Sequence, residues 1–579
     1  MKALVELAKR RGYFFQTGTA YGGVAGFYTY GPHGATVKAN VESAWRDRWA
    51  TREGHDEIDA PTILPEAVFE ASGHLDGFDD LLVECPECGQ SHRADHLIEA
   101  QTEISEAEGF TAEEIEELLA EHGATCPSCD AAVAGEPVEA FNLMFETSIG
   151  PGSTDRGYLR PETAQGIFVD FPRLREYARG ELPFGVAQIG RAYRNEISPR
   201  NALVRTREFN QAELEFFFDP AAHEPDLERV ADVSAPLYSA TAQQNDEGPT
   251  FQSIGEAVEN GPIADPWLGY YVGVATEWYD RLGIDLDRLR FRQHQPAERA
   301  HYAENCWDAE ADVSAPDEAP EWIELAGIAN RGTYDLSHHA EHTDERYSVF
   351  SEYDEPRTVE EATVDPDMAA LGPEFGSKAA DIAAALEELA ETDRSAFEGE
   401  TVTVELEDEI VEIPFEQTGF EVEEVTKRGE QFRPHVIEPS MGIDRTVYAI
   451  LVHAYDEDTV DGEERTVLRL DPEVAPTLVG VFPLMDKDGL GDRAQELAAD
   501  LRDAGLSVTY DDSGAIGRRY RRQDEIGTPY GVTVDYESLE DGTVTVRDRD
   551  TTDQVRVEIE DLAETLQGLR DGDITFDQL

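Results

Sequence analysis

Positive charge is the scarcest feature of this chain of 579 residues. It has 47 lysines and arginines against 123 aspartates and glutamates, a formal net charge of −76, and only 6 of the basic residues are lysines. Self-repulsion of this size opposes folding in dilute salt. At about 1 M salt the Debye length falls to about 3 Å, which screens most of that repulsion. We therefore interpret the acidity as an adaptation to a salt-rich cytoplasm, as in a halophilic organism.

Cysteines and long apolar stretches are also scarce. Five cysteines in so long a chain argue against a disulfide framework. No apolar run approaches the length of about 18 residues that a membrane helix needs, and no signal peptide opens the chain. The 25 Phe, 21 Tyr and 6 Trp exclude an acidic disordered protein, because they are sufficient for a core. We expect a soluble, cytoplasmic, globular protein of about three to four domains.

The stretch 188–218, QIGRAYRNEISPRNALVRTREFNQAELEFFF, predicts two strands joined by a loop around residues 198–201. Side chains on a strand alternate between two faces. One face of the second strand would therefore carry a row of polar and aromatic groups: Arg205, Arg207, Phe209, Gln211, Glu213 and Glu215. The opposite face is apolar and suits a core: Ala212, Leu214, Phe216 and Phe218.

The polar face of this hairpin has the chemistry of a nucleotide site. Arginine forks match phosphate oxygens, and a phenylalanine between them can stack on a base. A carboxylate further along the strand can hold an ammonium group. The pattern indicates a nucleoside triphosphate beside an amine-bearing ligand, and the alternative is a salt-bridged hairpin exposed to solvent.

Four of the five cysteines form two CxxC pairs: Cys85, Cys88, Cys126 and Cys129. Paired thiolates suit tetrahedral zinc, although the 37 residues between the pairs exceed the usual spacing. A helix predicted over 111–123 would place the site in a small inserted subdomain. Such a zinc would be structural, because four cysteines leave no open coordination position; the alternative is two pairs of reduced surface thiols. The remaining Cys306 is more often a small core residue.

Two glutamates stand in unexpected surroundings. Glu162 follows a proline near the start of a predicted helix, where it could face a ligand ammonium or cap the helix. Glu324 lies in a short apolar strand predicted over 322–329. A carboxylate in such a strand is costly unless it is paired or binds a cation.

Arg445 is also unexpected, because it opens a predicted helix after a turn at Gly442. The helix dipole favours a cation at the opposite end, so an arginine here is electrostatically misplaced unless an anion binds nearby. The alternative is a pairing with Asp444 or Glu438.

From about Ala475 a strand–helix–strand pattern predicts an α/β unit of about 100 residues. Four arginines fall within five residues of it: Arg518, Arg519, Arg521 and Arg522. Contact with the phosphate backbone of a nucleic acid would explain this density. The alternative is a helix face paired with neighbouring acids.

Taken together, these segments resemble the glycyl-tRNA synthetases, in the dimeric class II form found in archaea and eukaryotes. PTILPEAVFEASGH resembles the first class motif, used at the dimer interface, GRAYRNEISPRNALVRTREFNQAELEFF the second, and EPSMGIDR the third. RPETAQGIF, RQHQPAERAHYA, LGPEFG and GRRYRRQDEIGTPYG are similar to family-specific segments. The three motifs occur in order, and the resemblance covers nearly the whole chain.

The resemblance implies an α+β fold: a six-stranded antiparallel sheet flanked by helices, with inserted subdomains and a C-terminal α/β anticodon-binding domain. The implied parts are 1–84, the N-terminal part of the catalytic domain with the dimer motif; 85–140, an inserted zinc-knuckle subdomain; 141–353, the catalytic core with the second motif; 354–430, a second inserted subdomain; 431–473, the core with the third motif; and 474–579, the anticodon-binding domain. A homodimer is implied as well.

The implied reaction attaches glycine to tRNA(Gly) in two steps, through glycyl-adenylate formed from glycine and ATP with release of pyrophosphate. By resemblance Arg194 would hold the α-phosphate, Glu196 the adenine amino group, and Glu324 a Mg²⁺ ion. Phe209 would stack beneath the adenine, with Arg445 on its other face and near the γ-phosphate. The residues implied at ATP are Arg194, Asn195, Glu196, Val204, Arg205, Thr206, Arg207, Glu208, Phe209, Glu324, Leu325, Gly442, Ile443, Asp444 and Arg445.

The residues implied around glycine are Arg93, Glu162, Phe209, Asn210, Gln211, Ala212, Glu213, Glu438, Pro439, Ser440, Met441 and Gly442. Glu162 and Glu213 would flank the ammonium group, with Ser440 close to Cα. An added methyl group would overlap a pocket that these groups already fill. We therefore hypothesise that Glu213 and Ser440 exclude alanine.

Two alternatives remain. The first is a synthetase for another small amino acid, such as serine, threonine or proline; the paired Glu162 and Glu213 favour glycine. The second is a synthetase-like accessory subunit that binds nucleic acid without catalysis, which would be expected to lose the nucleotide-binding Arg194, Phe209 and Arg445. The basic surface expected for tRNA is sparse, so tRNA binding would depend on clusters such as the arginines at 518–522.

Overall fold

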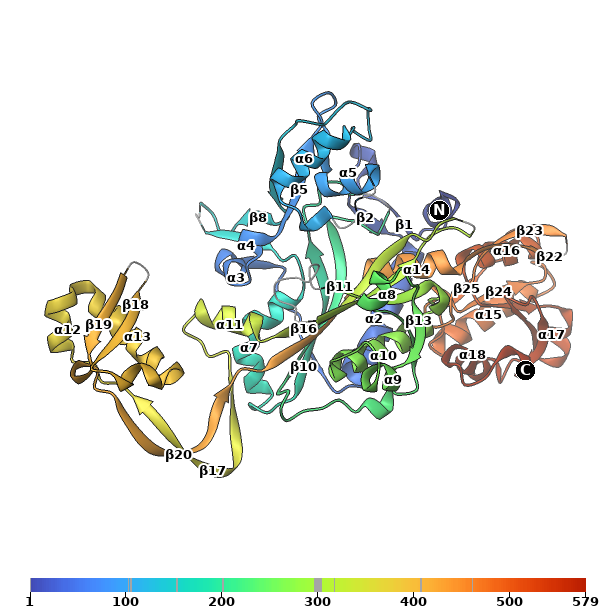
Figure 1. Cartoon of the computed structure of the whole chain (residues 1–579). Helices are drawn as coiled ribbons and strands as arrows, with labels where there is room; N and C mark the ends of the chain where they lie inside the picture. The colour runs from blue at the N-terminus through green and yellow to red at the C-terminus, as the bar shows by residue number, and fades with distance from the viewer. Residues whose placement is uncertain are drawn as a thin grey trace. The chain divides into compact units, whose positions relative to one another are not determined.

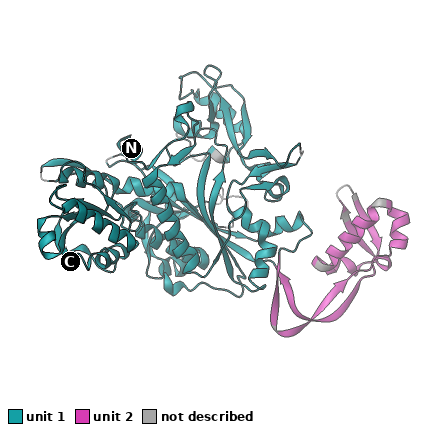
Figure 2. Cartoon of the chain, turned by 180° about the vertical axis from the view of Figure 1, so that it is seen from behind, with its two compact units in different colours: residues 1–347, 433–579 teal, residues 348–432 magenta. Residues whose placement is uncertain are grey.

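The computed structural model describes residues 2–579 except 103, 105, 106, 153, 154, 200, 201, 296–304, 317, 407, 408 and 461. Arg200 and Asn201 of the predicted loop, and most of the segment RQHQPAERAHYA, lie outside the described residues. The chain divides into two compact units, residues 1–347 with 433–579 and residues 348–432 (Figure 1 and Figure 2). Within the described ranges, no helix has both the length and the apolar character needed to cross a membrane.

A nine-stranded sheet forms the centre of the larger unit (Figure 1). In spatial order its strands are β13 (Thr250–Ser253), β12 (Ser234–Tyr238), β14 (Leu289–Gln293), β15 (Asn305–Asp312), β16 (Trp322–Gly332), β21 (His435–Gly442), β11 (Glu208–Phe218), β10 (Phe184–Tyr193) and β3 (Asp56–Glu57). The six strands from β14 to β10 pair antiparallel. Strand β12 joins β14 and strand β3 joins β10 in parallel, and β13 pairs antiparallel with β12 at the outer edge. The expected six-stranded antiparallel sheet is therefore confirmed as the centre of a wider one.

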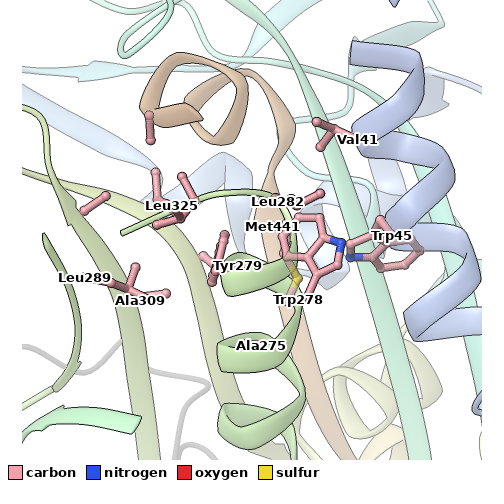
Figure 3. Packing of buried hydrophobic residues seen from close by; sticks show 14 of the residues in the cluster. Val41, Trp45, Ala275, Trp278, Tyr279, Leu282, Leu289, Ala309, Leu325 and Met441 are labelled. Atoms are coloured by element: carbon pink, nitrogen blue, oxygen red, sulfur yellow. The ribbon is translucent and has the colours of Figure 1, made fainter. Parts of the chain in front are cut away.

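The two faces of strand β11 pack against different parts of the protein. Its even-numbered side chains enter the main hydrophobic cluster, as predicted: Ala212, Leu214, Phe216 and Phe218. The helices that supply this cluster are α2 (Pro32–Trp45), α10 (Pro266–Arg281) and α14 (Ile443–Ala454). Figure 3 shows Trp45 and Trp278 beside Met441 of β21 in this core. On the other face, Phe217 contacts Phe171 of α7 (Ala164–Tyr177), with ring centroids 5.0 Å apart.

The N-terminal elements complete this core: α1 (Lys2–Arg10), β1 (Phe14–Gln16), β2 (Tyr28–Tyr30) and α2. Val37, Val41 and Trp45 recur at four-residue intervals on α2, so they share one face and are all fully buried. A π-helical stretch, Arg46–Thr51, continues the helix and buries Trp49. The rings of Trp45 and Trp49 stack with their centroids 6.2 Å apart.

The two CxxC pairs lie in a small subdomain with its own core. Its elements are β5 (Asp79–Glu84), β6 (Ser91–Arg93), α5 (Ala94–Gln101), α6 (Ala112–His122) and β7 (Val138–Asn142). The predicted helix is present as α6, and Thr111 with Glu114 forms a capping box at its start. Next to this subdomain in the chain, β4 (Ile63–Pro65), β9 (Arg156–Leu159) and β8 (Phe145–Ser148) form a separate three-stranded sheet, with α3 (Glu66–Ala71) and α4 (His74–Gly77) following β4.

The predicted α/β unit is present at the C-terminal end. Its elements are β24 (Val479–Pro483), α15 (Leu490–Asp503), β25 (Val508–Tyr510), α16 (Ile516–Ile526), β26 (Tyr530–Val534), α17 (Tyr536–Asp541), β27 (Thr543–Asp548), β28 (Gln554–Glu558) and α18 (Leu562–Asp571). The first three strands are parallel, and β27 and β28 continue the sheet antiparallel. The side chain of Glu525 on α16 pairs with Arg10 and Arg11 at the end of α1, which links this unit to the N-terminal elements.

The smaller unit is built on a long two-stranded ladder, β17 (Val349–Thr363) with β20 (Glu421–Phe432). Its remaining elements enclose a small core: α12 (Met368–Phe375), α13 (Ala379–Thr392), β18 (Thr401–Leu406) and β19 (Glu409–Pro414). In the ladder, Glu360 lies opposite Glu424 and Glu361 opposite Glu423. Like charges directly opposite each other destabilise a sheet, so this ladder depends on screening by salt.

Replacing one of these glutamates should therefore stabilise the ladder most at low salt. In Glu424→Lys, attraction to Glu360 replaces repulsion. We expect the amides of β17 and β20 to exchange several-fold more slowly with deuterium at about 0.1 M KCl, and the gain to shrink at about 1 M, where screening is short-ranged. Glu424→Gln, which only removes the repulsion, should lie between. An equal gain at both salt concentrations would contradict the electrostatic explanation.

Candidate active site

The ends of β10 and β11 carry the arginines that the sequence singled out. The strands pair from Phe184 with Phe217 to Tyr193 with Glu208. Arg205 and Arg207, which were predicted on the second strand, therefore lie on the connecting loop, together with Arg194 and Glu196. One further bond joins the N–H of Arg194 to the carbonyl of Arg207, and the N–H of Glu196 then donates to the carbonyl of Arg194 in a tight turn. The loop is then held by Arg207, whose guanidinium donates to the carbonyls of Glu196 and Ala25.

A cleft at these strand ends, which we call the arginine cleft, collects most of the residues expected around ATP. It is lined by Arg194, Glu196, Leu203, Val204, Arg205, Thr206, Phe209, Asn210, Gln211, Glu324, Leu325, Ser440, Gly442, Asp444 and Arg445. Of these, Leu203 was not predicted. Four residues of the expected ATP set do not line the cleft: Asn195, Arg207, Glu208 and Ile443.

Two arginines face this cleft from different elements. The guanidinium carbon of Arg194 lies 5.4 Å from the ring centroid of Phe209. Arg445, at the start of α14, donates to the carbonyl of Val204 at 3.0 Å and to the carboxylate of Glu324 at 3.1 Å. Desolvation would raise the pKa of Glu324, but the charges of Arg445 and Arg194 hold that pKa below its usual value. The cleft therefore offers Arg194, Arg445 and the ionised carboxylate of Glu324 to a phosphate–metal group, while its third arginine, Arg205, pairs with Glu196.

Asp444 and Glu438, the two alternative partners considered for Arg445, bind other groups. Asp444 accepts hydrogen bonds from the hydroxyl of Tyr30 at 2.5 Å and from the backbone N–H of Asn210 at 2.8 Å. Glu438 pairs with Arg331 at 2.9 Å. Asp444 thus fixes the start of α14 against β11, and the guanidinium of Arg445 extends toward Glu324 and the cleft.

A second cavity, the carboxylate cavity, shares Arg194, Gln211, Glu324 and Ser440 with the arginine cleft. Its other lining residues are Glu162, Glu213, His294, Cys306, Asp308, Gly327, Ala329 and Glu438. It therefore contains the two glutamates expected to flank an ammonium group, Glu162 just before α7 and Glu213 on β11.

Glu213 is held rigidly at the floor of this cavity. One carboxylate oxygen accepts hydrogen bonds from the hydroxyl of Thr163 and, at 2.6 Å, from the N–H of Ala164 at the start of α7. The other accepts from the hydroxyl of Ser440 at 2.5 Å. Burial, together with the nearby charge of Glu162, raises the pKa of Glu213. A ligand ammonium would reverse that effect by stabilising the ionised form.

Glu162 and Glu438 differ in electrostatics although both are buried. Burial alone would raise the pKa of Glu162, but His74 and Arg331 hold that pKa well below its usual range. Burial raises the pKa of Glu438 to about 8, with the charges of Glu213 and Glu162 adding to the rise and Arg331 opposing it. Glu162 is therefore ionised at neutral pH, whereas Glu438 titrates near it.

Arg331 lies at the centre of these carboxylates and was not predicted. Its guanidinium is bound by Glu438 and Asp335, and its side chain is only 2% exposed. Neither carboxylate oxygen of the adjacent Glu215 has a hydrogen-bond partner among the described residues, and burial raises the pKa of Glu215 well above its usual value. Glu215 is therefore a buried member of the predicted polar face whose neutral form is favoured by burial.

Several residues of the expected glycine set do not reach the cavity. The side chains of Ala212 and Met441 enter the main core, because they alternate with Glu213 and Ser440 along their strands. Pro439 likewise alternates with Ser440 and is outside the lining. Arg93 is held by Asp80 and Asp95 and lines neither cavity. Phe209, Asn210 and Gly442 line the arginine cleft instead.

The arginine cluster of the C-terminal unit lies on α16, but its members differ in exposure. Arg519 is buried, and it donates to the carbonyls of Pro483, Asp512 and Gly514. Because those carbonyls engage its guanidinium, Arg519 secures the start of α16. Arg521 and Arg522 are partly exposed and pair with Asp524 and Asp511, and Arg518 is exposed.

The four knuckle cysteines come together in a geometry that fits a metal. Their sulfur atoms all lie within 4.8 Å of one another, with Cys85 3.6 Å from Cys129 and Cys88 3.7 Å from Cys126. Zinc–sulfur bonds of about 2.3 Å in a tetrahedron place sulfurs about 3.8 Å apart. Within the described ranges, one further group of potential metal ligands is as closely spaced, formed by His294, Cys306 and Asp308.

Comparisons with known proteins agree with this geometry. Residues 150–454 match the family described as tRNA synthetase class II core domain (G, H, P, S and T), and residues 478–569 match the anticodon binding domain family. The chain is 47% identical over 576 residues to the protein named glycine--tRNA ligase of Methanothrix thermoacetophila, covering 99% of this chain and 98% of that protein. The proteins of the same name from Methanothermobacter thermautotrophicus and Methanocaldococcus jannaschii are 46% and 45% identical, over 98% and 97% of this chain and 98% of each relative.

Both catalytic and anticodon-binding parts are thus matched, in the same order along the chain, and identity to the relatives extends over its full length. The cleft of arginines and the adjoining cavity of carboxylates lie on the class II core. The chain belongs to the glycyl-tRNA synthetases, the glycine--tRNA ligases of class II.

Proposed function

We propose that this protein activates glycine with ATP and transfers it to tRNA(Gly), with the nucleotide in the arginine cleft and the amino acid in the carboxylate cavity. The observation that carries this proposal is that the two share Arg194, Gln211, Glu324 and Ser440 as walls. Ligands in the two spaces would meet beside Arg194. Adenylate formation requires positioning and charge neutralisation, because the attacking carboxylate of glycine is already ionised.

The arginine cleft would position the triphosphate. Arg194 would neutralise charge that develops on the α-phosphate, and Arg445 would hold the departing pyrophosphate. Phe209 would support the adenine ring and Glu196 would accept from its amino group. Glu324 would hold Mg²⁺ together with phosphate oxygens, since Mg²⁺ at such sites is bound by one or two carboxylates plus phosphates; the ion would supply additional charge neutralisation.

The carboxylate cavity would select glycine by charge and size. Glu162 and Glu213 would bind the ammonium group, which removes the mutual repulsion that raises the pKa of Glu213. Ser440 donates to Glu213 and lines both spaces, so it stands where a side chain of the substrate would project. A methyl group would then overlap Ser440 or displace its hydrogen bond.

We further propose a structural zinc at Cys85, Cys88, Cys126 and Cys129, for which the sulfur spacing is the support. A homodimer would cover the exposed apolar side chains of Ile63 and Ile149, which meet at Gly157 in the three-stranded sheet of β4, β9 and β8. Arg518 and the partly exposed Arg521 and Arg522 would contact tRNA. The net charge of −76 supports a cytoplasm rich in salt, as in a halophile.

The activity is tested by amino-acid-dependent ATP–pyrophosphate exchange in about 1 M KCl, with each of the common amino acids. Exchange with glycine alone is expected, and Arg194→Ala should lower it by about 10²-fold or more, since a phosphate-stabilising donor is lost. Arg191→Ala is the matched control, because Arg191 is an exposed arginine near the end of β10 that pairs with Glu208. Exchange that depends on another amino acid would contradict the assignment of glycine as the substrate. An equal loss of exchange in both variants would contradict the specific role of Arg194.

Selection against alanine is tested at Ser440. In Ser440→Gly the wall loses both Cβ and the hydroxyl, so we expect alanine-dependent exchange to appear and the preference for glycine in kcat/KM to fall by about tenfold or more. Ser440→Ala removes the hydroxyl but keeps Cβ, which separates the steric effect from the lost hydrogen bond to Glu213. Alanine activation that stays undetectable in Ser440→Gly would show that this residue does not exclude the methyl group.

Glycine binding should also depend on pH through Glu438. Its pKa of about 8 means that the carboxylate becomes ionised as the pH rises through that value, while the ammonium of glycine remains protonated. The added negative charge attracts the ammonium, so KM for glycine should fall by about tenfold between pH 6.5 and 8. Glu438→Gln should flatten this dependence and keep a hydrogen bond to Arg331. A KM that rises over the same interval would contradict the assignment.

A further inference from the structure

We propose that His294, Cys306 and Asp308 form a binding site for a thiophilic divalent cation, such as Zn²⁺, in the wall of the carboxylate cavity. The site is distinct from the four knuckle cysteines and from Glu324. It differs from the knuckle in its mixed nitrogen, sulfur and oxygen ligands and in facing a cavity.

Sheet pairing brings the three side chains to one face. His294 directly follows β14, and its backbone N–H donates to the carbonyl of Cys306 on β15 at 3.0 Å. Asp308 is two residues further along β15, so it shares a face with Cys306. As a result the imidazole nitrogen, the thiol sulfur and a carboxylate oxygen all lie within 4.8 Å of one another.

The spacing of these atoms is close to that of a tetrahedral zinc site. The sulfur of Cys306 is 3.6 Å from Asp308 Oδ1, and His294 Nε2 is 2.5 Å from Asp308 Oδ2. With zinc–sulfur bonds of about 2.3 Å and bonds to nitrogen and oxygen of about 2.0–2.2 Å, ligand atoms lie about 3.4–3.6 Å apart. The distance from the Cys306 sulfur to Oδ1 of Asp308 already matches this spacing. The distance from His294 Nε2 to Oδ2 would have to lengthen by about 1 Å.

The donor set selects the kind of cation. A thiolate and an imidazole favour zinc and related ions, whereas Mg²⁺ prefers oxygen ligands alone. Three protein ligands leave a coordination position open toward the cavity, as in zinc sites that bind a further ligand. Glu162, Glu213 and Glu438 line the same cavity and give it a negative potential that attracts cations.

The neighbouring strand leaves room for the ion. Gly327 on β16 is paired with Asp308, and a Cβ at that position would lie 3.7 Å from Asp308 Oδ1. The missing side chain keeps the carboxylate accessible from the cavity. When the cation binds, the proton of the Cys306 thiol passes to solvent and the thiolate becomes a ligand.

A cation at this site would act on the amino-acid substrate. It adds positive charge to the wall that faces the proposed ammonium position between Glu162 and Glu213. Because like charges repel, bound Zn²⁺ would weaken glycine binding. The open coordination position would allow water or a substrate carboxylate to complete the shell.

Metal content of the full-length protein tests the site. Equilibrium dialysis against buffered free Zn²⁺, followed by elemental analysis, is expected to give two Zn²⁺ ions for each wild-type chain, one at the knuckle and one here. Cys306→Ser, which keeps the shape of the side chain, should hold one. Asp308→Asn should lower the affinity for the second ion by about tenfold or more, because a charged ligand is lost. Far-ultraviolet circular dichroism checks that each variant is folded.

Cobalt distinguishes the two sites by their spectra. Added to wild-type protein whose knuckle holds zinc, Co²⁺ should give a sulfur-to-cobalt charge-transfer band of one-thiolate intensity, absent in Cys306→Ser. Glu310→Gln is the control on the same strand and should retain this band, because Glu310 pairs with Arg290 and belongs to neither metal group. One zinc per wild-type chain, or an unchanged count and band in Cys306→Ser, would overturn the proposal and leave a hydrogen-bonded trio without an ion.

Discussion

The buried contact of Arg331 with Asp335 and Glu438 is the interaction on which the site depends. It stands beside the carboxylates of Glu162 and Glu213, which could not be buried so close together without a central cation. A buried pair contributes little net stability compared with apolar packing, but removing one partner leaves an uncompensated charge and costs about 3–5 kcal/mol. Arg331 therefore lowers the pKa values of Glu162 and Glu438 from outside the cavity lining, on the strand next to β21.

The same strands that form the core also form the site, and alternation keeps the two apart. On β11, Leu214 packs into the main cluster while Glu213 accepts hydrogen bonds from the start of α7 and from Ser440 on β21. A shift of one residue in pairing would exchange the two sets. That shift would also turn Phe216 and Phe218 of β11 out of the cluster that they share with the fully buried Trp45 and Trp278.

The sequence predicted the secondary-structure elements and the kinds of functional group in the site better than it predicted which side chains contact each other. Alternation placed the apolar face of β11 correctly, and two CxxC pairs were enough to expect a metal cluster. Which residue lies opposite which depends on long-range pairing, so the juxtaposition of His294 with Cys306 across β14 and β15 left no local signal. The exposure of side chains could not be predicted for the same reason. Four arginines within five residues do not reveal that Arg519 turns inward and donates to backbone carbonyls. Only a charged residue in an apolar strand, such as Arg331, could have indicated the central ion pair.

The ladder of β17 and β20 has a consequence for how the chain can change in evolution. Its first and last residues, Val349 and Phe432, are paired, so the smaller unit begins and ends at one place. The following strand β21, which carries Glu438 and Ser440, starts three residues later. An insertion whose ends meet can be lengthened, shortened or exchanged with a tight turn in its place, without altering the register of the catalytic strands. The unit is thus a replaceable module.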